Sequence, residues 1–278
     1  MLRRAVVFFL LTGPWVCFGH DLISEKECDF FLDSQKPQQI LKTFYPNFTN
    51  NPCLSGSMQN AMAPWLLPLC HKMKPVLDRL FANPNVVNSE RTLRKAGFKI
   101  LFSQHRSKIR VIAHPKLPGY LIKLFPNCEK NLVSSAWKRL TIRCIVAQKI
   151  KSIIARHHIH HFIVADKWLY PLPPNLKKKE SIPVVLLVRN MNIYNREDSK
   201  HVWKNHINGC ILQELYKILG RGYGSAFLSG NLPYSKRGKF AFIDTEYDKR
   251  KIPLQHVKKF VSPKMRHYWD YLVKQHKL

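Results

Sequence analysis

One segment near the carboxyl end of the chain, residues 230–246, constrains the fold more than any other. The apolar run Phe-Ala-Phe-Ile at 240–243 is followed directly by Asp244 and Glu246, and a loop with Asn231 precedes it. An apolar run of this length between turn residues predicts a strand that is buried on both faces. The backbone of such a strand is fixed, so the polar side chains at its exit are held in place. Two carboxylates and an amide held in this way suit a hard divalent cation, which prefers oxygen ligands.

The chain begins like a secretory signal peptide. Two arginines precede an apolar stretch of about 14 residues, and the small residues Cys17 and Gly19 fit a cleavage site. The segment 1–19 therefore predicts an exported or secreted protein, and an uncleaved membrane anchor is the alternative. The apolar stretch is too short to cross a bilayer comfortably, and no later stretch is long enough. We expect no transmembrane segment after the signal is removed.

Removal of the signal leaves six of the seven cysteines. An even number in an exported protein permits up to three disulfides, and spacing alone does not choose among their connectivities. A local pair among Cys28, Cys53 and Cys70 is one prediction. Cys144 and Cys210 fall on apolar faces of predicted helices, where an unpaired buried thiol is the alternative.

The charge of the chain is strongly positive, with 46 Lys and Arg against 17 Asp and Glu and a formal net charge of +29. Such a surface attracts polyanions and anionic surfaces, including nucleic acid, acidic glycans, anionic lipid and phosphorylated ligands. A basic composition without any specific partner is the alternative. With 45% hydrophobic residues the chain can build a core, which excludes disorder throughout.

The pattern of apolar residues predicts an α+β fold. Residues 20–95 are polar or helical with prolines, and three short apolar runs then predict an antiparallel meander. Helical and strand patterns alternate after it. The strands are expected at 98–102, 109–113, 120–125, 162–165, 182–188 and 240–243, and the helices at 133–157, 200–219 and 254–276.

This order of elements resembles the protein kinase-like fold over about residues 95–250. Lys123 lies on the third predicted strand, whose lysine in that family grips the nucleotide phosphates. Asn231 precedes Asp244 by 13 positions, which is similar to the interval between the family's two metal-binding residues. The resemblance implies that Lys123 contacts ATP and that Asn231 and Asp244 hold Mg²⁺ or Mn²⁺, with Glu246 assisting.

The same resemblance implies three regions after the signal peptide. Residues 20–95 form a helical amino-terminal extension, 96–190 a kinase-like amino-terminal lobe, and 191–278 a reduced helical carboxyl-terminal lobe with the metal-site loop and strand. The implied ligand is a nucleotide or another phosphorylated molecule.

The chain also departs from the family pattern. Ala226 stands where the family has its catalytic Asp, and the first turn of the meander contains no glycine. The helix expected at 133–157 has no Glu, so Gln148 is by elimination the candidate partner of Lys123. These departures favour a binding module or pseudokinase over an active phosphotransferase, and we assign no catalytic residue. A basic secreted interaction protein that binds polyanions without enzymatic activity is the alternative function.

Each site residue also has a local explanation. Lys123 is in that case a solvent-facing lysine, Asn231 an ordinary turn former, and the two carboxylates partners of the nearby Lys249 and Arg250. The joint order and spacing of these residues favours the site.

Four histidines at 157, 158, 160 and 161 follow the helix expected at 133–157. Histidines at the carboxyl end of a helix interact favourably with its dipole. Because no carboxylate or cysteine stands nearby at metal-ligand spacing, we interpret this run as a helix end and not as a metal site.

Overall fold

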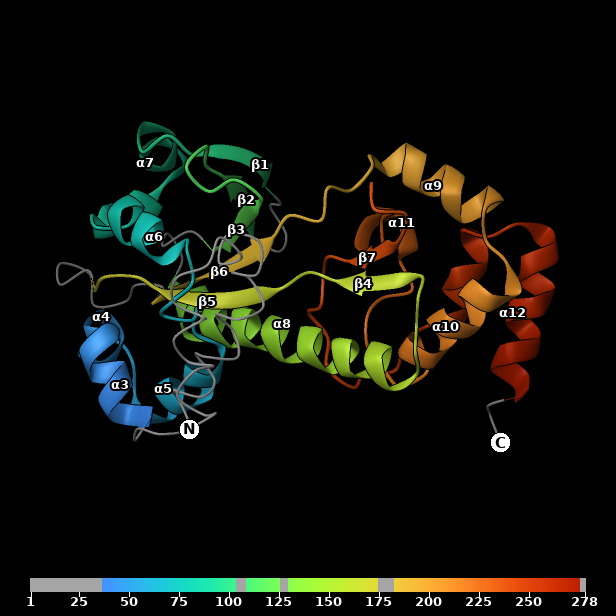
Figure 1. Ribbon diagram of the computed structural model, residues 1–278, viewed down its shortest axis with the longest axis horizontal. Coiled ribbons are helices and arrows are strands. Elements are labelled where there is room, and N and C mark those ends of the chain that lie inside the picture. Colours follow the sequence, from blue (N-terminus) through green and yellow to red (C-terminus); the bar gives the residue numbers. More distant parts are fainter. Residues whose placement is uncertain (1–36, 104–108, 126–129, 175–182, 276–278) are drawn as a thin grey trace, which may run out of the picture.

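The computed structural model describes residues 37–103, 109–125, 130–174 and 183–275, and it shows a mixed α+β protein (Figure 1). The predicted signal peptide, residues 1–19, lies outside the described residues, as do Cys28 and Cys128.

A five-stranded antiparallel sheet forms the amino-terminal half, in the order β1-β2-β3-β6-β5. A separate parallel pair, β4 with β7, lies in the carboxyl-terminal half. The predicted meander is confirmed as β1, β2 and β3. The strands are β1 (Lys99–Ser103), β2 (Arg110–Ala113), β3 (Tyr120–Leu124), β4 (Phe162–Val164), β5 (Lys167–Pro171), β6 (Val184–Arg189) and β7 (Phe240–Phe242).

Helices surround both halves. The amino-terminal ones are α3 (Pro37–Phe44), α4 (Pro46–Thr49), α5 (Gly56–Met62), α6 (Lys74–Leu80) and α7 (Glu90–Lys95), with 3₁₀ turns η2 (Ala63–Trp65) and η3 (Pro84–Asn88). The later ones are α8 (Lys130–Arg156), α9 (Arg196–Asn205), α10 (Gly209–Leu219), α11 (Leu228–Asn231), η4 (Leu254–Lys259) and α12 (Pro263–Gln275). Among the helices that the structure describes, none has the length and apolar character needed to cross a membrane.

Helix α8 joins the two halves. Its 27 residues contain neither Gly nor Pro, so nothing in the sequence interrupts the backbone hydrogen bonds. The first half of the helix packs Ala136 and Leu140 under the sheet, and the second half packs Val146 and Ile150 into the core of the carboxyl-terminal half. Figure 1 shows α8 running beneath both sheets. The helix therefore fixes how the five-stranded sheet lies relative to β4 and β7.

The end of α8 has the geometry of a Schellman motif. His158 has a positive φ of 47°, the Ile159 N–H donates to the Ile154 carbonyl at 2.9 Å, and the His158 N–H donates to the Ala155 carbonyl at 3.3 Å. These two bonds satisfy carbonyls that the helix leaves open, and they turn the chain sharply into β4.

Strand β6 is buried on both faces, as its unbroken apolar sequence predicts. Leu186 and Val188 pack toward α8, whereas Val185 and Leu187 pack toward the amino-terminal helices. The sheet is thus covered on both sides along β6, whereas Leu121 and Lys123 of β3 are partly exposed.

Three expectations are corrected. The helix expected at 200–219 is two helices, because Asn208 caps the start of α10 by accepting a hydrogen bond from the Ile211 N–H at 3.0 Å. Strand β5 was not among the expected strands; it lies at the edge of the sheet, where its one proline, Pro171, removes no ladder bond from a neighbour. The segment expected as one helix at 254–276 is the 3₁₀ turn η4 followed by α12.

The two helical cysteines also differ from each other. Cys144 is a buried free thiol, and burial raises its pKa to about 12. Cys210 is free but exposed, because it lies in the first turn of α10. The alternative of an unpaired buried thiol is therefore confirmed for Cys144, whereas Cys210 is unpaired but not buried.

Candidate functional site

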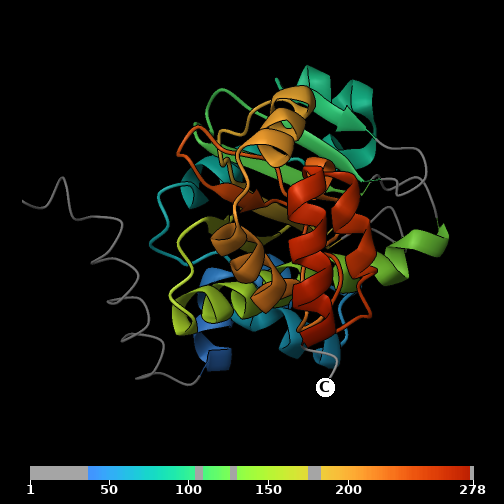
Figure 2. The same ribbon diagram turned by 90° about the vertical axis from the view of Figure 1, so that its right-hand side faces the viewer.

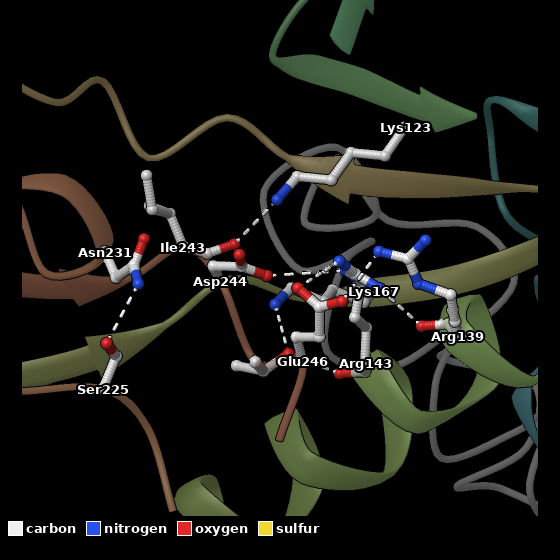
Figure 3. A network of polar contacts seen from close by, with 10 residues as sticks. Lys123, Arg139, Arg143, Lys167, Ser225, Asn231, Ile243, Asp244 and Glu246 are labelled. Atoms are coloured by element: carbon white, nitrogen blue, oxygen red, sulfur yellow. Dashed lines mark hydrogen bonds and ion pairs between the residues drawn. The ribbon is translucent and has the colours of Figure 1, made fainter. Parts of the chain in front are cut away.

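Two lysines on the sheet point toward α8. Lys123 on β3 lies opposite Leu186, and Lys167 on β5 lies opposite Val188. Directly opposed residues on neighbouring strands share a face, and Leu186 and Val188 face α8. Both ammonium groups therefore lie between the sheet and the helix (Figure 3).

Strand β7 brings the carboxylates to the same place. All three of its residues are buried, and the chain leaves it through Ile243. The Lys123 Nζ donates a hydrogen bond to the Ile243 carbonyl at 3.1 Å, directly before Asp244. A lysine and an aspartate that are 121 positions apart in the sequence thus meet where the two halves of the molecule join.

Two arginines of α8 pair with the carboxylates. Arg139 and Arg143 are four residues apart, so they project from one face of the helix. The Arg139 Nη2 lies 2.9 Å from Glu246 Oε1, and the Arg143 Nη2 lies 3.0 Å from Glu246 Oε2. The Arg143 Nε lies 3.4 Å from Asp244 Oδ1. The Arg143 side chain is only 2% exposed, so these ion pairs reach into the protein interior.

The residue between the carboxylates links the sheet to the helix. The buried Lys167 donates from Nζ to the Thr245 hydroxyl at 2.6 Å, and that hydroxyl donates to the Arg143 carbonyl at 2.6 Å. Lys167 is thus held by a short chain of hydrogen bonds, but within the described part of the chain no carboxylate hydrogen-bonds to its ammonium group.

One buried oxygen in this cluster is unsatisfied. Asp244 Oδ1 accepts no hydrogen bond from the described residues, and the Arg143 Nε that faces it donates none. Their separation is short enough for an ion pair, but the alignment is wrong for a hydrogen bond. A buried polar atom without a partner calls for an explanation, and a ligand or metal ion is one.

Burial and charge act in opposite directions on the ionisable groups. Burial alone would raise the pKa of Asp244. Four nearby basic side chains outweigh burial and hold this pKa below its usual value: Lys123, Arg143, Lys167 and Arg139. Burial lowers the pKa of Lys123 although Asp244 and Glu246 favour its charge. Burial, together with the charge of Lys123, holds the pKa of Lys167 well below the usual lysine value. The site therefore keeps the aspartate ionised and disfavours the charge of both lysines.

Asn231 ends the short helix α11 instead of lying in an open loop. Its side-chain Nδ2 donates to the Ser225 hydroxyl at 3.0 Å, and its backbone carbonyl accepts from the Ile243 N–H at 3.2 Å. The loop before α11 passes so close to β7 that a Cβ atom on Gly224 would lie only 2.6 Å from the ring of Phe242. The structure thus places Asn231 beside the chain that leads into Asp244.

Gln148 does not join the cluster. Its side chain is exposed on α8, five residues beyond Arg143, and among the described residues Lys123 has no hydrogen bond to it. Five residues correspond to a rotation of about 140° around a helix, so the two side chains point in different directions. The expected pairing of Gln148 with Lys123 is therefore corrected: the hydrogen bond of Lys123 goes to the Ile243 carbonyl.

The local explanations of Lys123 and of the two carboxylates are also corrected. Lys123 points inward instead of facing solvent, and the carboxylates pair with the arginines of α8 instead of Lys249 and Arg250. Arg250 instead lies over the Tyr247 ring at 3.5 Å.

The sequence did not identify four members of the cluster as site residues: Arg139, Arg143, Lys167 and Thr245. The i, i+4 spacing of the arginines was a signal, but it is also typical of a solvated helix face. Lys167 gave no signal, because its strand was not predicted.

The chain matches no protein-family model, and no curated protein matches it. The chemistry of the site must therefore be argued from its residues. Four basic side chains surround two carboxylates here: the two arginines match the carboxylates in charge, and each lysine adds positive charge when it is protonated. Such an arrangement can hold an anionic group, and the unsatisfied Asp244 oxygen can hold a cation that accompanies it.

Proposed function

We propose that the cluster around Asp244 binds a phosphorylated ligand, with ATP and Mg²⁺ or Mn²⁺ as the candidate pair, and that phosphotransfer is weak or absent. The observation that carries the proposal is the buried Asp244 Oδ1, which accepts no hydrogen bond from any residue that the structure describes, although basic side chains surround it. A metal ion would satisfy this oxygen, and phosphate oxygens would balance the surrounding positive charge.

The donor set fits such a metal. Asp244 supplies a carboxylate and Asn231 an amide oxygen, which are the hard ligands that Mg²⁺ and Mn²⁺ prefer. Asn231 uses its Nδ2 toward Ser225, which leaves its oxygen as a candidate ligand. The metal would neutralise phosphate charge when it is bound.

Lys123 and Lys167 have separate roles in this proposal. Lys123 binds a phosphate oxygen once its hydrogen bond to the Ile243 carbonyl is broken. Lys167, which hydrogen-bonds to Thr245, adds positive charge to the same site. A phosphate would favour the charged form of both lysines, which burial disfavours in the free protein.

Glu246 has a different role from the one first expected. Each of its oxygens already pairs with an arginine, so it holds Arg139 and Arg143 in place and does not take the metal. In this contact helix α8 supplies the positive charges, and the segment after β7 supplies the carboxylate.

The kinase-like resemblance supports the proposal through the order of the elements. Three antiparallel strands with Lys123 on the third, a long helix, further strands and a final strand that leads into Asp244 occur in that order. Ala226 is buried and offers no base, which is why we propose binding and not efficient catalysis. Export of the protein, inferred from residues 1–19, is part of the same proposal.

A thermal melt with ATP, with and without Mg²⁺ or Mn²⁺, tests the proposal. Binding to the folded state raises the melting temperature by mass action, so we expect a shift that requires both ATP and the metal. Lys123→Met and Asp244→Ala should each abolish the shift. Lys200→Met removes an exposed lysine that pairs with Glu197 and should leave the shift unchanged. A shift that survives in Asp244→Ala would show that the ligand binds elsewhere.

A second candidate is polyanion binding without chemistry. A hollow of about 430 Å³ beside α10 is lined by His157, Lys217 and Arg221 among other residues, and it presents basic side chains to solvent. A polyanion bound there would dissociate steeply with added salt and would ignore divalent metal. Heparin binding that is lost in a Lys217→Gln and Arg221→Gln double variant, but kept in Asp244→Ala, would favour this function.

A further inference from the structure

Three metal-ligating side chains meet in the carboxyl-terminal half, away from the Asp244 cluster. A ring nitrogen of His161, the Sγ of Cys210 and a carboxylate oxygen of Glu214 lie within 4.8 Å of one another. His161 belongs to the segment between α8 and β4, and the other two residues belong to α10. The carboxylate and cysteine that the histidine run lacks in the sequence are thus supplied by a distant helix.

The local structure explains why these side chains converge. Cys210 and Glu214 are four residues apart on α10, so both project from one face of the helix. The Schellman turn at the end of α8 directs the chain past that face into β4. Figure 1 shows the start of β4 and α10 next to each other, and Figure 2 shows α10 beside α12 on the same side of the molecule.

Glu214 is held rigidly in this position. It is only 6% exposed, and its two oxygens accept from the His160 N–H at 3.1 Å and the His161 N–H at 2.9 Å. The His161 Nδ1 lies 3.0 Å from Glu214 Oε2. A carboxylate has about four lone-pair sites, so these contacts leave it able to bind a cation or to orient the histidine that binds one.

The other two donors are open to solvent. Cys210 is exposed and His161 is partly exposed, whereas Glu214 forms the inner wall of the cluster. A metal ion can therefore enter from solvent, and it meets an immobilised carboxylate on the inside. A purely structural role for Glu214, in which it caps the turn after α8, explains its hydrogen bonds to the two backbone N–H groups. It does not explain why the Cys210 thiol lies beside this carboxylate.

We propose that His161, Cys210 and Glu214 form a zinc site with water at the fourth position. Zinc takes nitrogen, sulfur and oxygen ligands in a tetrahedron at about 2.0–2.3 Å, which places neighbouring donors about 3.3–3.8 Å apart. Donors within 4.8 Å of one another reach that spacing by small side-chain rotations, which the exposure of Cys210 and His161 permits. A thiolate, a carboxylate and a neutral imidazole also balance the charge of Zn²⁺.

Such a site would tie α10 to the start of β4. Strand β4 pairs with β7, which leads into Asp244, so bound zinc would stabilise the half of the molecule that presents this aspartate. The proposal does not depend on nucleotide binding, because no residue is shared between the two clusters.

Titration of the full mature protein with Co²⁺ tests the proposal, since the absorption spectrum of bound Co²⁺ depends on which ligands hold the ion. We expect one equivalent to bind with a thiolate-to-cobalt charge-transfer band and intense visible bands of tetrahedral type, and Zn²⁺ should bleach both. In Cys210→Ser the charge-transfer band should vanish and the affinity should fall at least about tenfold. His161→Gln should have the same effect on affinity.

Two controls keep the result interpretable. His160→Gln changes an exposed neighbouring histidine and should bind Co²⁺ as the unmodified protein does. Asp244→Ala removes the other proposed metal ligand and should leave the cobalt spectrum unchanged. Cys210 is exposed, so its serine variant should melt like the unmodified protein without metal. A charge-transfer band that persists in Cys210→Ser, or no cobalt bound with thiolate character, would overturn the site.

Discussion

The two polar clusters of this protein face opposite electrostatic situations. Around Asp244 four basic side chains surround two carboxylates, whereas around Glu214 the described residues place only backbone N–H groups, an imidazole and a thiol beside a buried carboxylate. The Asp244 cluster can therefore accept a further negative charge, and the Glu214 cluster can accept a positive one. Buried carboxylates alone therefore do not define a metal site, because the side chains around them decide which ligand completes the charge balance.

The two clusters also differ in how they are held. The Asp244 cluster depends on long side chains from three separate elements, β3, β5 and α8. The Glu214 carboxylate is fixed by two backbone hydrogen bonds. We expect the first cluster to rearrange when a ligand binds and the second to change little.

The largest expected effect comes from Arg143→Ala. This change leaves Asp244 and Glu246 without a buried partner, and loss of one partner of a buried ion pair costs about 3–5 kcal/mol of the free energy of unfolding. Both carboxylates are partly exposed, so we expect the lower end of that range. Urea unfolding measures it. Arg139→Ala, which removes a more exposed partner, should cost about 1 kcal/mol or less. Equal losses in the two variants would contradict the assignment of Arg143 as the buried anchor.

A smaller effect of opposite sign is expected from Lys167→Met. The change replaces a buried amine, whose charged form burial disfavours, with an apolar side chain that is one atom shorter, and such replacements often raise the free energy of unfolding by about 1–3 kcal/mol. We expect a higher melting temperature together with loss of the ATP-dependent shift. Lys149→Met removes a half-exposed lysine that pairs with Asp248, and it should change stability by about 1 kcal/mol or less. Lower stability in Lys167→Met would show that this lysine supports the fold and is not kept for a ligand.

The smallest effect is the pH dependence that Asp244 contributes in the absence of metal. The pKa of its carboxyl is lowered from 3.8 in the folded protein, so its stabilising contribution is complete above that value and is lost as the pH falls through the folded pKa. Asp244→Asn should therefore be less stable than the unmodified protein near pH 6, and the two should converge as the pH falls below the lowered folded pKa. Urea midpoints in chelator measure this. Parallel curves for the two proteins would mean that the folded pKa of Asp244 is not lowered.

Much of the fold could be predicted from local patterns. The runs at 98–102, 109–113 and 120–125 became β1 to β3, and the helix expected at 133–157 is α8. Strand β5 was missed because prolines disguise an edge strand, and the break between α9 and α10 was missed because an asparagine cap interrupts a continuous apolar stripe. These errors occur where a side chain or an edge position overrides the periodic signal.

Local sequence patterns were enough to show which residues could carry chemistry and where each stands on its own element. They placed Lys123 on the third strand and Asp244 after a buried strand, and they marked the histidines after α8. Only the tertiary structure decided their partners: Arg143 with Asp244, Lys167 with Thr245, and His161 with a glutamate 53 residues away. The physical reason is that periodicity reports which face of a helix or strand is buried, whereas contacts between distant segments depend on how all the elements pack together.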